Sequence, residues 1–429
     1  MMKRREFLHA GWQTAVYSAL SRPARAEWLR FTPQSRSQTE STPSRVEDRV
    51  ARILEAFDAQ GNHRTGTDVD NRSAEWLAAE VRRLGIEPSL EPFTLNRVDP
   101  QECYLAVGGR RIDSVPIFDA GFTDAKGVRG KLGLLGSDAD IAVAASGRRT
   151  VGDTANRAQN EVDRARRSRH NAVVVVTHDV RPGLFLLNAN EFLRPVGPPM
   201  LQVSSSEDAW LQQQVTAGEE ATVVAHVNRT TAQALNVTAE VLGSDPALAP
   251  LVFMAPRSGW WQCASEQGSR LVCWLEVMRT LATSRPPRRS LFVAMSGHEL
   301  GYLGIDPYLN RRPNLVKQAY AWVFFGSDIG QPHQPNLIHA SDDQLERWAV
   351  TALAGQALNV DAKTPHDAEA RGETGAIQRG GGRFFTIACE SRVFHNVGDR
   401  WPEAIDVSQL SRYARAFADG ALQLAQLTS

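Results

Sequence analysis

The sequence has little of the material from which several classes of protein are built. Its 429 residues include four cysteines and no C-x-x-C pair, which excludes a disulfide scaffold and a zinc knuckle. Lysine plus arginine and aspartate plus glutamate number 48 each, so no charge excess points to nucleic acid or to an anionic membrane. No G-x-S-x-G occurs, which argues against a serine hydrolase. Hydrophobic residues make up 42%, as in an ordinary soluble globular protein, and the length suggests two or three structural units.

The N-terminus has the form of an export signal. Lys3-Arg4-Arg5-Glu6-Phe7-Leu8 is a twin-arginine motif, and Ala24-Arg25-Ala26 places small residues where a signal peptidase would cut. The apolar stretch between them is shorter than the ~20 residues of a bilayer span, so we expect no integral membrane segment after signal removal. We predict a twin-arginine signal peptide over 1–26, a flexible lead-in over 27–44, and a periplasmic or extracellular protein. The alternative is a basic, partly helical tail.

The pattern of apolar residues in the first half of the mature chain changes near residue 100. Amphipathic spacing predicts two helices and a strand before this point. Short apolar runs separated by Gly, Pro and Asp then predict a β-rich module to about residue 230, with a basic helix on its flank. The expected elements are helices over 45–57 and 72–84, a strand over 87–93, strands over 132–135, 171–177, 200–203 and 221–227, and the basic helix over 156–169.

From Leu235 onward strands and helices alternate. Strands are expected over 251–255, 290–295, 320–325 and 383–388, and helices over 268–283, 342–358 and 407–427. Because the strands are almost entirely apolar, this pattern predicts an α/β fold with a mainly parallel mixed sheet sandwiched by helices. In such sheets ligands and catalytic groups collect in the loops at the carboxyl ends of the strands.

Several short segments follow one another in an informative order. They are His63-Arg64-Thr65-Gly66-Thr67, Asn236 to Ser244, Glu299 to Gly304, and His395-Asn396-Val397-Gly398-Asp399. This order resembles the co-catalytic zinc aminopeptidases, whose relatives include glutamate carboxypeptidase, transferrin receptor and glutaminyl cyclase. The resemblance implies a zinc-exopeptidase-like domain over 45–100 and 232–429. It also implies an inserted protease-associated-like domain over 101–231.

The resemblance further implies two zinc ions ~3.5–4 Å apart that activate a bridging water. Several of the ligand positions carry side chains that cannot serve. The first ligand segment aligns with Pro256 and Ser258, and the later aspartate position falls on Ser327, with Asp328 as an out-of-register candidate. Pro256, Ser258 and Ser327 are therefore degenerate positions, and the proline side chain has no donor atom at all.

The remaining ligand positions keep oxygen or nitrogen donors. Glu266, Glu299 and His395 match the bridging, glutamate and histidine ligands, and three such groups suffice in principle for a single zinc ion. His298 stands where the family has its general base. A metalloprotease of the H-E-x-x-H type is excluded, because Leu300-Gly301-Tyr302 follows Glu299.

Two functions compete. We favour a non-catalytic descendant of the peptidases, a pseudoenzyme candidate that binds a peptide or protein partner, with no nucleic acid as partner. The alternative is an active mononuclear-zinc aminopeptidase or hydrolase that uses Glu266, Glu299 and His395 with His298 as base. Zinc is thus expected as zero or one ion.

Simpler roles stay open for several of these side chains. His298 could hydrogen-bond Glu299, and Glu266 could cap the helix that follows it. Trp260-Trp261 could fill space at the site or form an aromatic wall for a ligand. Whether Cys263 and Cys273 pair in an oxidising compartment is not decided by their spacing.

Overall fold

The computed structural model describes residues 45–146 and 157–428, which belong to one compact unit of the chain. The expected signal peptide over 1–26, the lead-in over 27–44 and Asn156 lie outside these residues. Within the described part, no helix has the length and apolar character that crossing a membrane would require.

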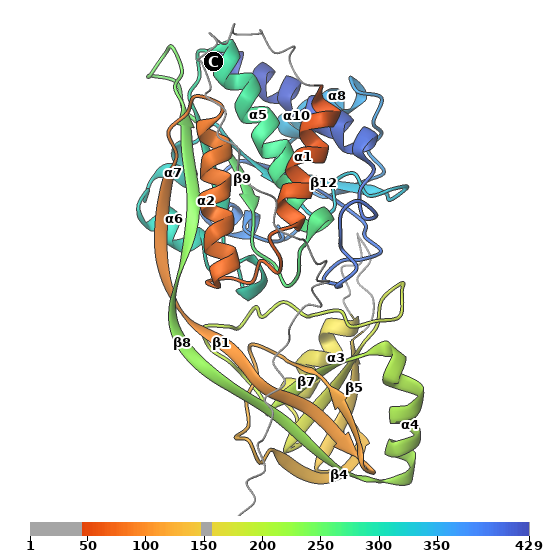
Figure 1. Ribbon diagram of the computed structural model, residues 1–429. Helices are drawn as coiled ribbons and strands as arrows, with labels where there is room; N and C mark the ends of the chain where they lie inside the picture. Colours follow the sequence, from red (N-terminus) through yellow and green to blue (C-terminus); the bar gives the residue numbers. More distant parts are fainter. Residues whose placement is uncertain (1–44, 147–156, 429) are drawn as a thin grey trace, which may run out of the picture. The chain divides into compact units, whose positions relative to one another are not determined.

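The centre of the fold is a sheet whose middle strands run parallel (Figure 1). In the order β10, β9, β11 and β14 each strand is parallel to the next. Antiparallel strands flank this group, with β8 beside β10 and β12 beside β14, and β13 pairs with β12. The bounds are β8 Glu220–Val241, β9 Leu251–Pro256, β10 Ser290–Met295, β11 Ala321–Phe325, β12 Asn336–Ala340, β13 Ala362–Thr364 and β14 Phe384–Cys389. The predicted mainly parallel α/β sheet is confirmed.

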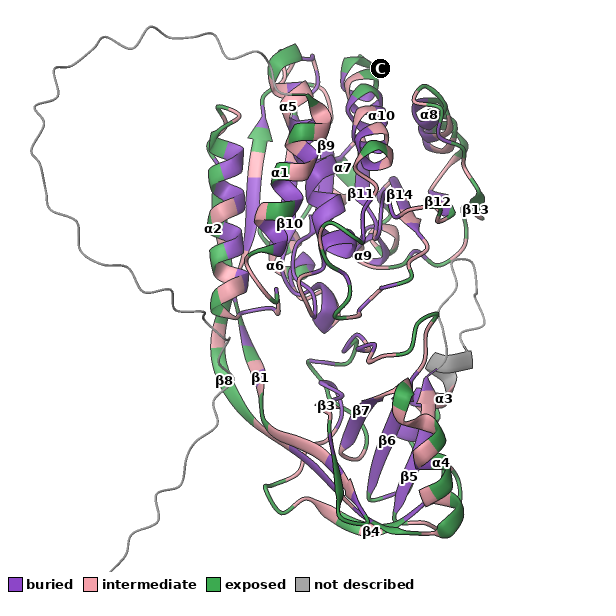
Figure 2. Cartoon of the chain, turned by 45° about the vertical axis from the view of Figure 1, so that its right-hand side comes forward, coloured by how far each residue is buried: buried purple, intermediate pink, exposed green. Residues whose placement is uncertain are grey.

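Helices cover both faces of this sheet. Side chains alternate along β9, so that Phe253 and Ala255 enter one hydrophobic core while Val252 and Met254 enter another. The first core is shared with α1 Val46–Asp58, α2 Asp68–Arg82, α5 Ser269–Ser284, α8 Asp343–Ala354 and α10 Val407–Gln426. The second is shared with α6 Ile305–Asn310, α7 Leu315–Gln318 and α9 Thr374–Arg379. Figure 2 shows the central strands as buried, as two-sided cover requires.

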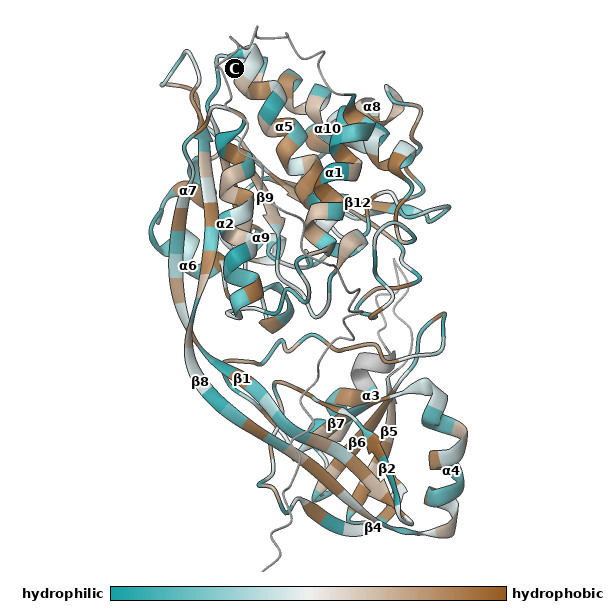
Figure 3. Ribbon diagram, viewed as in Figure 1, coloured by the Kyte–Doolittle hydropathy of each residue, from teal (hydrophilic) through white to brown (hydrophobic). Residues whose placement is uncertain are grey.

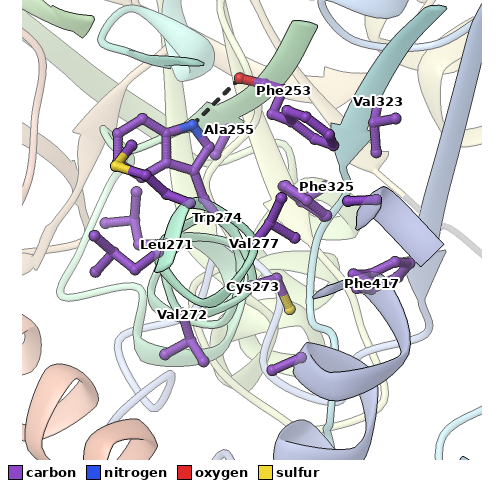
Figure 4. Packing of buried hydrophobic residues seen from close by; sticks show 14 of the residues in the cluster. Phe253, Ala255, Leu271, Val272, Cys273, Trp274, Val277, Val323, Phe325 and Phe417 are labelled. Carbon is purple, nitrogen blue, oxygen red and sulfur yellow. Dashed lines mark hydrogen bonds between the residues drawn. The ribbon is translucent and has the colours of Figure 1, made fainter. Parts of the chain in front are cut away.

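Helix α5, which follows the candidate ligand Glu266, is held in place by its packing against the sheet. The indole N–H of Trp274 donates to the carbonyl of Phe253 at 3.2 Å (Figure 4). The indole also meets Phe292 edge to face, with ring centroids 5.5 Å apart. A buried indole with a satisfied N–H and an edge-to-face partner is stabilising, so α5 is anchored directly on β9 and its neighbours.

Two long strands carry the sheet into the β-rich part of the chain, which has a hydrophobic core of its own. Strands β1 (Ser89–Val107) and β8 pair antiparallel along most of their length, and they pass positions 101 and 231, where we expected the insert to begin and end. The sheet continues from β8 through β4, β5, β6 and β7 to β3. The middle of the β1–β8 ribbon is largely hydrophilic (Figure 3). The other elements here are β2 Arg110–Asp113, β3 Val115–Pro116, β4 Val128–Leu134, β5 Ile141–Ser146, β6 Ala172–Thr177, β7 Met200–Ser204, α3 Arg157–Arg166 and α4 Asp208–Ala217.

Candidate functional site

The loops after β9, β10, β11 and β14 meet at one edge of the sheet, because these strands are parallel. Pro256 ends β9, and Arg257 follows it with no exposed surface. The Arg257 guanidinium donates through Nη1 to Asp70 Oδ1 at 2.7 Å and to the Asp70 carbonyl at 2.6 Å. Burial raises the pKa of Asp70 and the charge of Arg257 opposes that rise. In the first predicted ligand segment, the residue between Pro256 and Ser258 therefore forms a buried ion pair with Asp70 of α2.

Glu299 is held by hydroxyl and amide donors. It lies in a short 3-10 turn, His298–Leu300, after β10. Its Oε1 accepts from the backbone N–H and the hydroxyl of Thr65 at 2.8 and 2.7 Å, and its Oε2 accepts from the Ser258 hydroxyl at 2.8 Å. Burial raises the pKa of Glu299, while the Thr65 and Ser258 hydrogen bonds lower it. Ser258 and Thr65 thus occupy both oxygens of a predicted zinc ligand.

His298 contacts a carboxylate that the sequence did not single out. Its Nδ1 lies 3.0 Å from Oε1 of Glu373, and both side chains are almost fully buried. Glu373 stands just before α9. The simpler role considered for His298, a hydrogen bond to Glu299, is replaced here by one to Glu373. No motif marks Glu373, so sequence reasoning had no signal for it.

Glu266 and His395 face each other. Glu266 lies in a single π-helical turn, Ala264–Gly268, and its Oε1 is 3.4 Å from His395 Nε2. Burial alone would raise the pKa of Glu266, but nearby positive charge, that of His395 foremost, outweighs this effect and holds the pKa at about 2. The His395 Nδ1 donates to the Leu186 carbonyl at 2.6 Å. Among the described residues, Glu266 Oε2 and His395 Nε2 have no hydrogen-bond partner.

Arg270 is the cation of this site. It lies in the first turn of α5 and is 2% exposed. Within the described part of the chain, its Nε and Nη1 have no hydrogen-bond partner. Burial lowers its pKa, and the charges of Glu266, Glu373 and Asp328, in that order, oppose the effect. An arginine stays protonated even when buried, so a permanent positive charge stands among these carboxylates.

Asp328 is buried, whereas Ser327 beside it is only half-buried. The Oδ1 of Asp328 accepts from the Ser265 hydroxyl at 2.8 Å, and burial followed by the charge of Glu266 raises its pKa to about 6. Ser327 uses its carbonyl to accept from the Cys389 N–H. The residue out of register in the family comparison is thus the one that joins the buried cluster.

The described residues contain one group of three or more His, Cys, Asp or Glu side chains with ligand atoms within 4.8 Å of one another. It consists of Cys263, Glu266 and Asp399. Both Asp399 oxygens accept backbone N–H groups, from Ser265 at 2.7 Å and Glu266 at 3.0 Å. Burial raises the pKa of the Cys263 thiol well above its usual range, which disfavours the thiolate that binds metal. Of the predicted triad, the structure brings Glu266 and His395 into contact and turns Glu299 toward Ser258.

A strap from the β-rich part of the chain lies against the loops of the site. We define the strap as residues 184–192. The Leu186 N–H donates to the His395 carbonyl at 3.2 Å, the Ala189 N–H donates to the Glu299 carbonyl at 2.8 Å, and Phe185 forms an antiparallel bridge with Asn396. These contacts lie against the two loops that carry the candidate ligands.

The two adjacent tryptophans support this arrangement from the loop after β9. Trp260 is 1% exposed and lies in a core with the strap residues Leu186, Ala189 and Phe192. The Trp261 indole donates to the His395 carbonyl at 2.9 Å. Trp260 therefore fills space and offers no exposed aromatic wall. All four cysteines, Cys263 and Cys273 included, are free.

Comparisons with known proteins identify the fold. No family model matches the sequence, and no curated protein matches it significantly. A zinc aminopeptidase from Bacillus subtilis superposes with a TM-score of 0.69 at 16% identity, over 90% of this chain and 95% of that one. A peptidase M28 precursor from Shewanella amazonensis gives 0.69 at 15%, over 90% and 96%. An aminopeptidase from an Aneurinibacillus strain gives 0.65 at 14%, over 88% and 93%.

The class that these neighbours define is the zinc aminopeptidase fold, and this chain has that fold. Identities of 14 to 16% establish the architecture. The chemistry of this particular chain has to be argued from its own side chains.

Proposed function

We propose that this protein is a non-catalytic member of the aminopeptidase-fold proteins that binds a peptide or protein partner outside the membrane. The observation that carries the proposal is the buried guanidinium of Arg270, whose charge interacts with the carboxylates of Glu266, Glu373 and Asp328. This fixed cation supplies part of the positive charge that metal ions supply in a two-zinc site. The ligand set around it does not fit a pair of zinc ions.

Electrostatics supports the misfit. A zinc ion bound by Glu266 would be repelled by the permanent charge of Arg270, which interacts with the same carboxylate. Glu299 already accepts three hydrogen bonds, so a metal ion would have to share its oxygens with Thr65 and Ser258. Pro256 offers no donor, and Ser327 is not part of the buried cluster.

Loss of the general base supports the same conclusion. His298 takes the position of the base, and its Nδ1 is already paired with Glu373. Removing a positioned acid or base group typically costs ~10²–10⁴ in rate. The imidazole of His298, with Nε2 as the ring nitrogen that is not paired with Glu373, thus stands in place of the carboxylate base that the resemblance implies.

Export through the twin-arginine route belongs to the same proposal. The motif at Arg4-Arg5 and the small residues of Ala24-Arg25-Ala26 support it. The β-rich part over 101–231, with its own core, supports a protease-associated-like insert. N-terminal sequencing of exported protein should find a chain that begins near Glu27, and an intact N-terminus would contradict the signal.

The catalytic part is tested by reconstruction. Purified protein in excess zinc should not hydrolyse amino-acid anilides, and His298→Glu should restore no activity, because the second metal would still lack its ligands. Glu299→Ala is the matched control for any residual rate. Hydrolysis that depends on zinc and disappears in Glu299→Ala would overturn the proposal.

A second candidate, a mononuclear-zinc hydrolase, is favoured by one observation. Glu266 Oε2 and His395 Nε2 lack hydrogen-bond partners among the described residues and belong to side chains in contact. Two electron-pair donor atoms without a hydrogen-bond partner are suited to bind a cation. The candidate needs Glu299 as third ligand. Elemental analysis that finds one zinc ion per chain, together with hydrolysis of amino-acid anilides that Glu299→Ala abolishes, would establish it against the first.

A further inference from the structure

A pocket rich in arginine lies between α1, α2 and α5, which run side by side in Figures 1 and 2. Its volume is about 420 Å³, and none of its lining residues belongs to the strand-end site. We call it the arginine pocket. Its charged residues are Arg49, Arg52, Glu80, Arg83, Glu276 and Arg279.

The first half of the pocket is organised around Glu80. Arg52 donates from Nη1 to Glu80 Oε1 at 2.9 Å and from Nη2 to Oε2 at 2.7 Å. Arg83 also donates to Oε1. The Glu80 side chain is 4% exposed, whereas those of Arg52 and Arg83 are 47% and 63% exposed. Both carboxylate oxygens are therefore covered by guanidinium groups that themselves reach solvent.

The second half repeats the arrangement around Glu276. Arg49 donates from Nε to Glu276 Oε1 at 2.8 Å and from Nη2 to Oε2 at 2.5 Å. Arg279 donates to Oε1 at 3.4 Å. Each buried carboxylate thus fixes two guanidinium groups, and bidentate pairing holds one of them in a defined orientation.

Four guanidinium groups and two carboxylates leave an excess of two positive charges in one pocket. The chain as a whole has no net charge, so a generally basic surface does not explain the excess. Like charges held together are unfavourable unless an anion compensates them. The pocket is therefore preorganised for a dianionic group, since its cations are already oriented by buried partners.

We propose that the arginine pocket binds the phosphoryl group of a small phosphate monoester. Such a group carries about −1.5 to −2 charges at pH 7, which matches the excess, and guanidinium groups bind its oxygens in a bidentate manner. Ile53, Leu84 and Leu275 also line the pocket and suit the organic body of a monoester. The volume falls within the roughly 300–1,000 Å³ of small-molecule sites. This site is independent of the proposed function of the strand-end loops.

Isothermal titration of the full chain with phenyl phosphate at constant ionic strength tests the proposal. We expect saturable one-site binding that weakens about tenfold in Arg83→Gln and in Arg279→Gln, as the loss of one charge-assisted hydrogen bond implies. Both variants leave the bidentate pairs intact. Arg82→Gln is the matched control, because Arg82 lies beside Arg83 on α2, pairs with Glu87 and does not line the pocket.

Every result of this titration either supports or contradicts the proposal. No saturable binding, equal weakening in Arg82→Gln, or unchanged affinity in both pocket variants would overturn the proposal. Titration with inorganic phosphate separates the two sources of a phosphoryl group. We expect it to bind more weakly than phenyl phosphate, and equal affinity would overturn the assignment of a monoester. Thermal melts show whether each variant is folded.

Discussion

At the scale of single residues, two buried arginines, Arg257 and Arg270, lie near the strand-end loops. Arg257 pairs with Asp70 on α2, whereas Arg270 has two nitrogens without a partner in the described chain and interacts electrostatically with Glu266, Glu373 and Asp328. The two residues are equally buried but differently used. Comparing them tests whether the Arg270 charge is specific to the site.

Arg270→Met should destabilise the protein by roughly 3–5 kcal/mol, the cost of leaving buried charges without their partner. It should also create a response to zinc, because the carboxylates would then need another cation. Urea unfolding with and without zinc measures both effects.

Arg257→Met is the control for that experiment. It should lose comparable stability, since it strands Asp70, without gaining a response to zinc. An Arg270→Met protein as stable as the wild type would contradict the role assigned to this cation. So would an equal zinc response in both variants.

His63 makes the fold sensitive to acid. Its ring stacks on Phe57 with centroids 3.8 Å apart, and its Nδ1 lies 3.1 Å from the Gln262 carbonyl. Burial, with the charge of Arg257, lowers the pKa of His63 from 6.5 to about 3. Below pH 6.5 the unfolded chain binds a proton that the folded chain does not, so acid favours unfolding.

Stability should therefore fall as the pH drops from 6.5 toward 3 and should not change through this group above 6.5. Between pH 7 and pH 5 this group should contribute a loss of about 2 kcal/mol, partly offset by Asp328, whose raised pKa acts in the opposite direction. The His63 contribution should be absent in His63→Asn and present in His178→Asn, a half-exposed histidine. Denaturant unfolding at the two pH values measures this, and an unchanged loss in His63→Asn would contradict it.

Most residues of the candidate site could be predicted from the sequence, but their pairing could not. Glu266, His298, Glu299 and His395 were found through short segments in a recognisable order, and all are buried at the strand-end loops. Arg270 and Glu373 were missed. Their roles depend on how α5 and α9 pack, which no local spacing encodes.

At the scale of elements, the predicted bounds are correct where local sequence signals determine them and wrong where pairing with a distant strand determines them. The helix predicted over 72–84 begins at Asp68, because the Thr67 hydroxyl accepts the Asp70 N–H and caps an earlier turn. The strand predicted over 87–93 extends over Ser89–Val107 as β1, since β8 pairs with it far along the chain. Distant pairing of this kind is invisible to periodicity.

The strap is the element whose order should control access to the strand-end loops. Phe192 is 3% exposed and belongs to the core that includes Trp260, whereas Leu193 beside it is 73% exposed. Phe192→Ala should loosen the strap by removing buried apolar contacts. Leu193→Ala removes none.

Amide hydrogen exchange measures this effect. The Leu186 and Ala189 amides, which bond to His395 and Glu299, should exchange roughly tenfold faster or more in Phe192→Ala. They should keep wild-type rates in Leu193→Ala. Equal rates in wild type and Phe192→Ala would show that the strap is not held by this core.

At the scale of the whole molecule, alternation of apolar strands and helices after residue 235 was enough to predict the mainly parallel sheet. Strands β9, β10, β11 and β14 lie where they were expected to within a residue or so. The β-rich half was predicted from its texture, but its strand order depends on the long β1–β8 ribbon. The fold has been kept across neighbours of 14 to 16% identity, while ligand chemistry is free to diverge.

The most direct test of the account is a crystal of this protein grown with excess zinc and measured at the zinc absorption edge. We predict no pair of anomalous peaks at the carboxyl ends of β9, β10 and β11, with the Arg270 guanidinium between the carboxylates of Glu266, Glu373 and Asp328. Two well-occupied ions bridged by a solvent molecule at that place would contradict the account and make the protein a working peptidase.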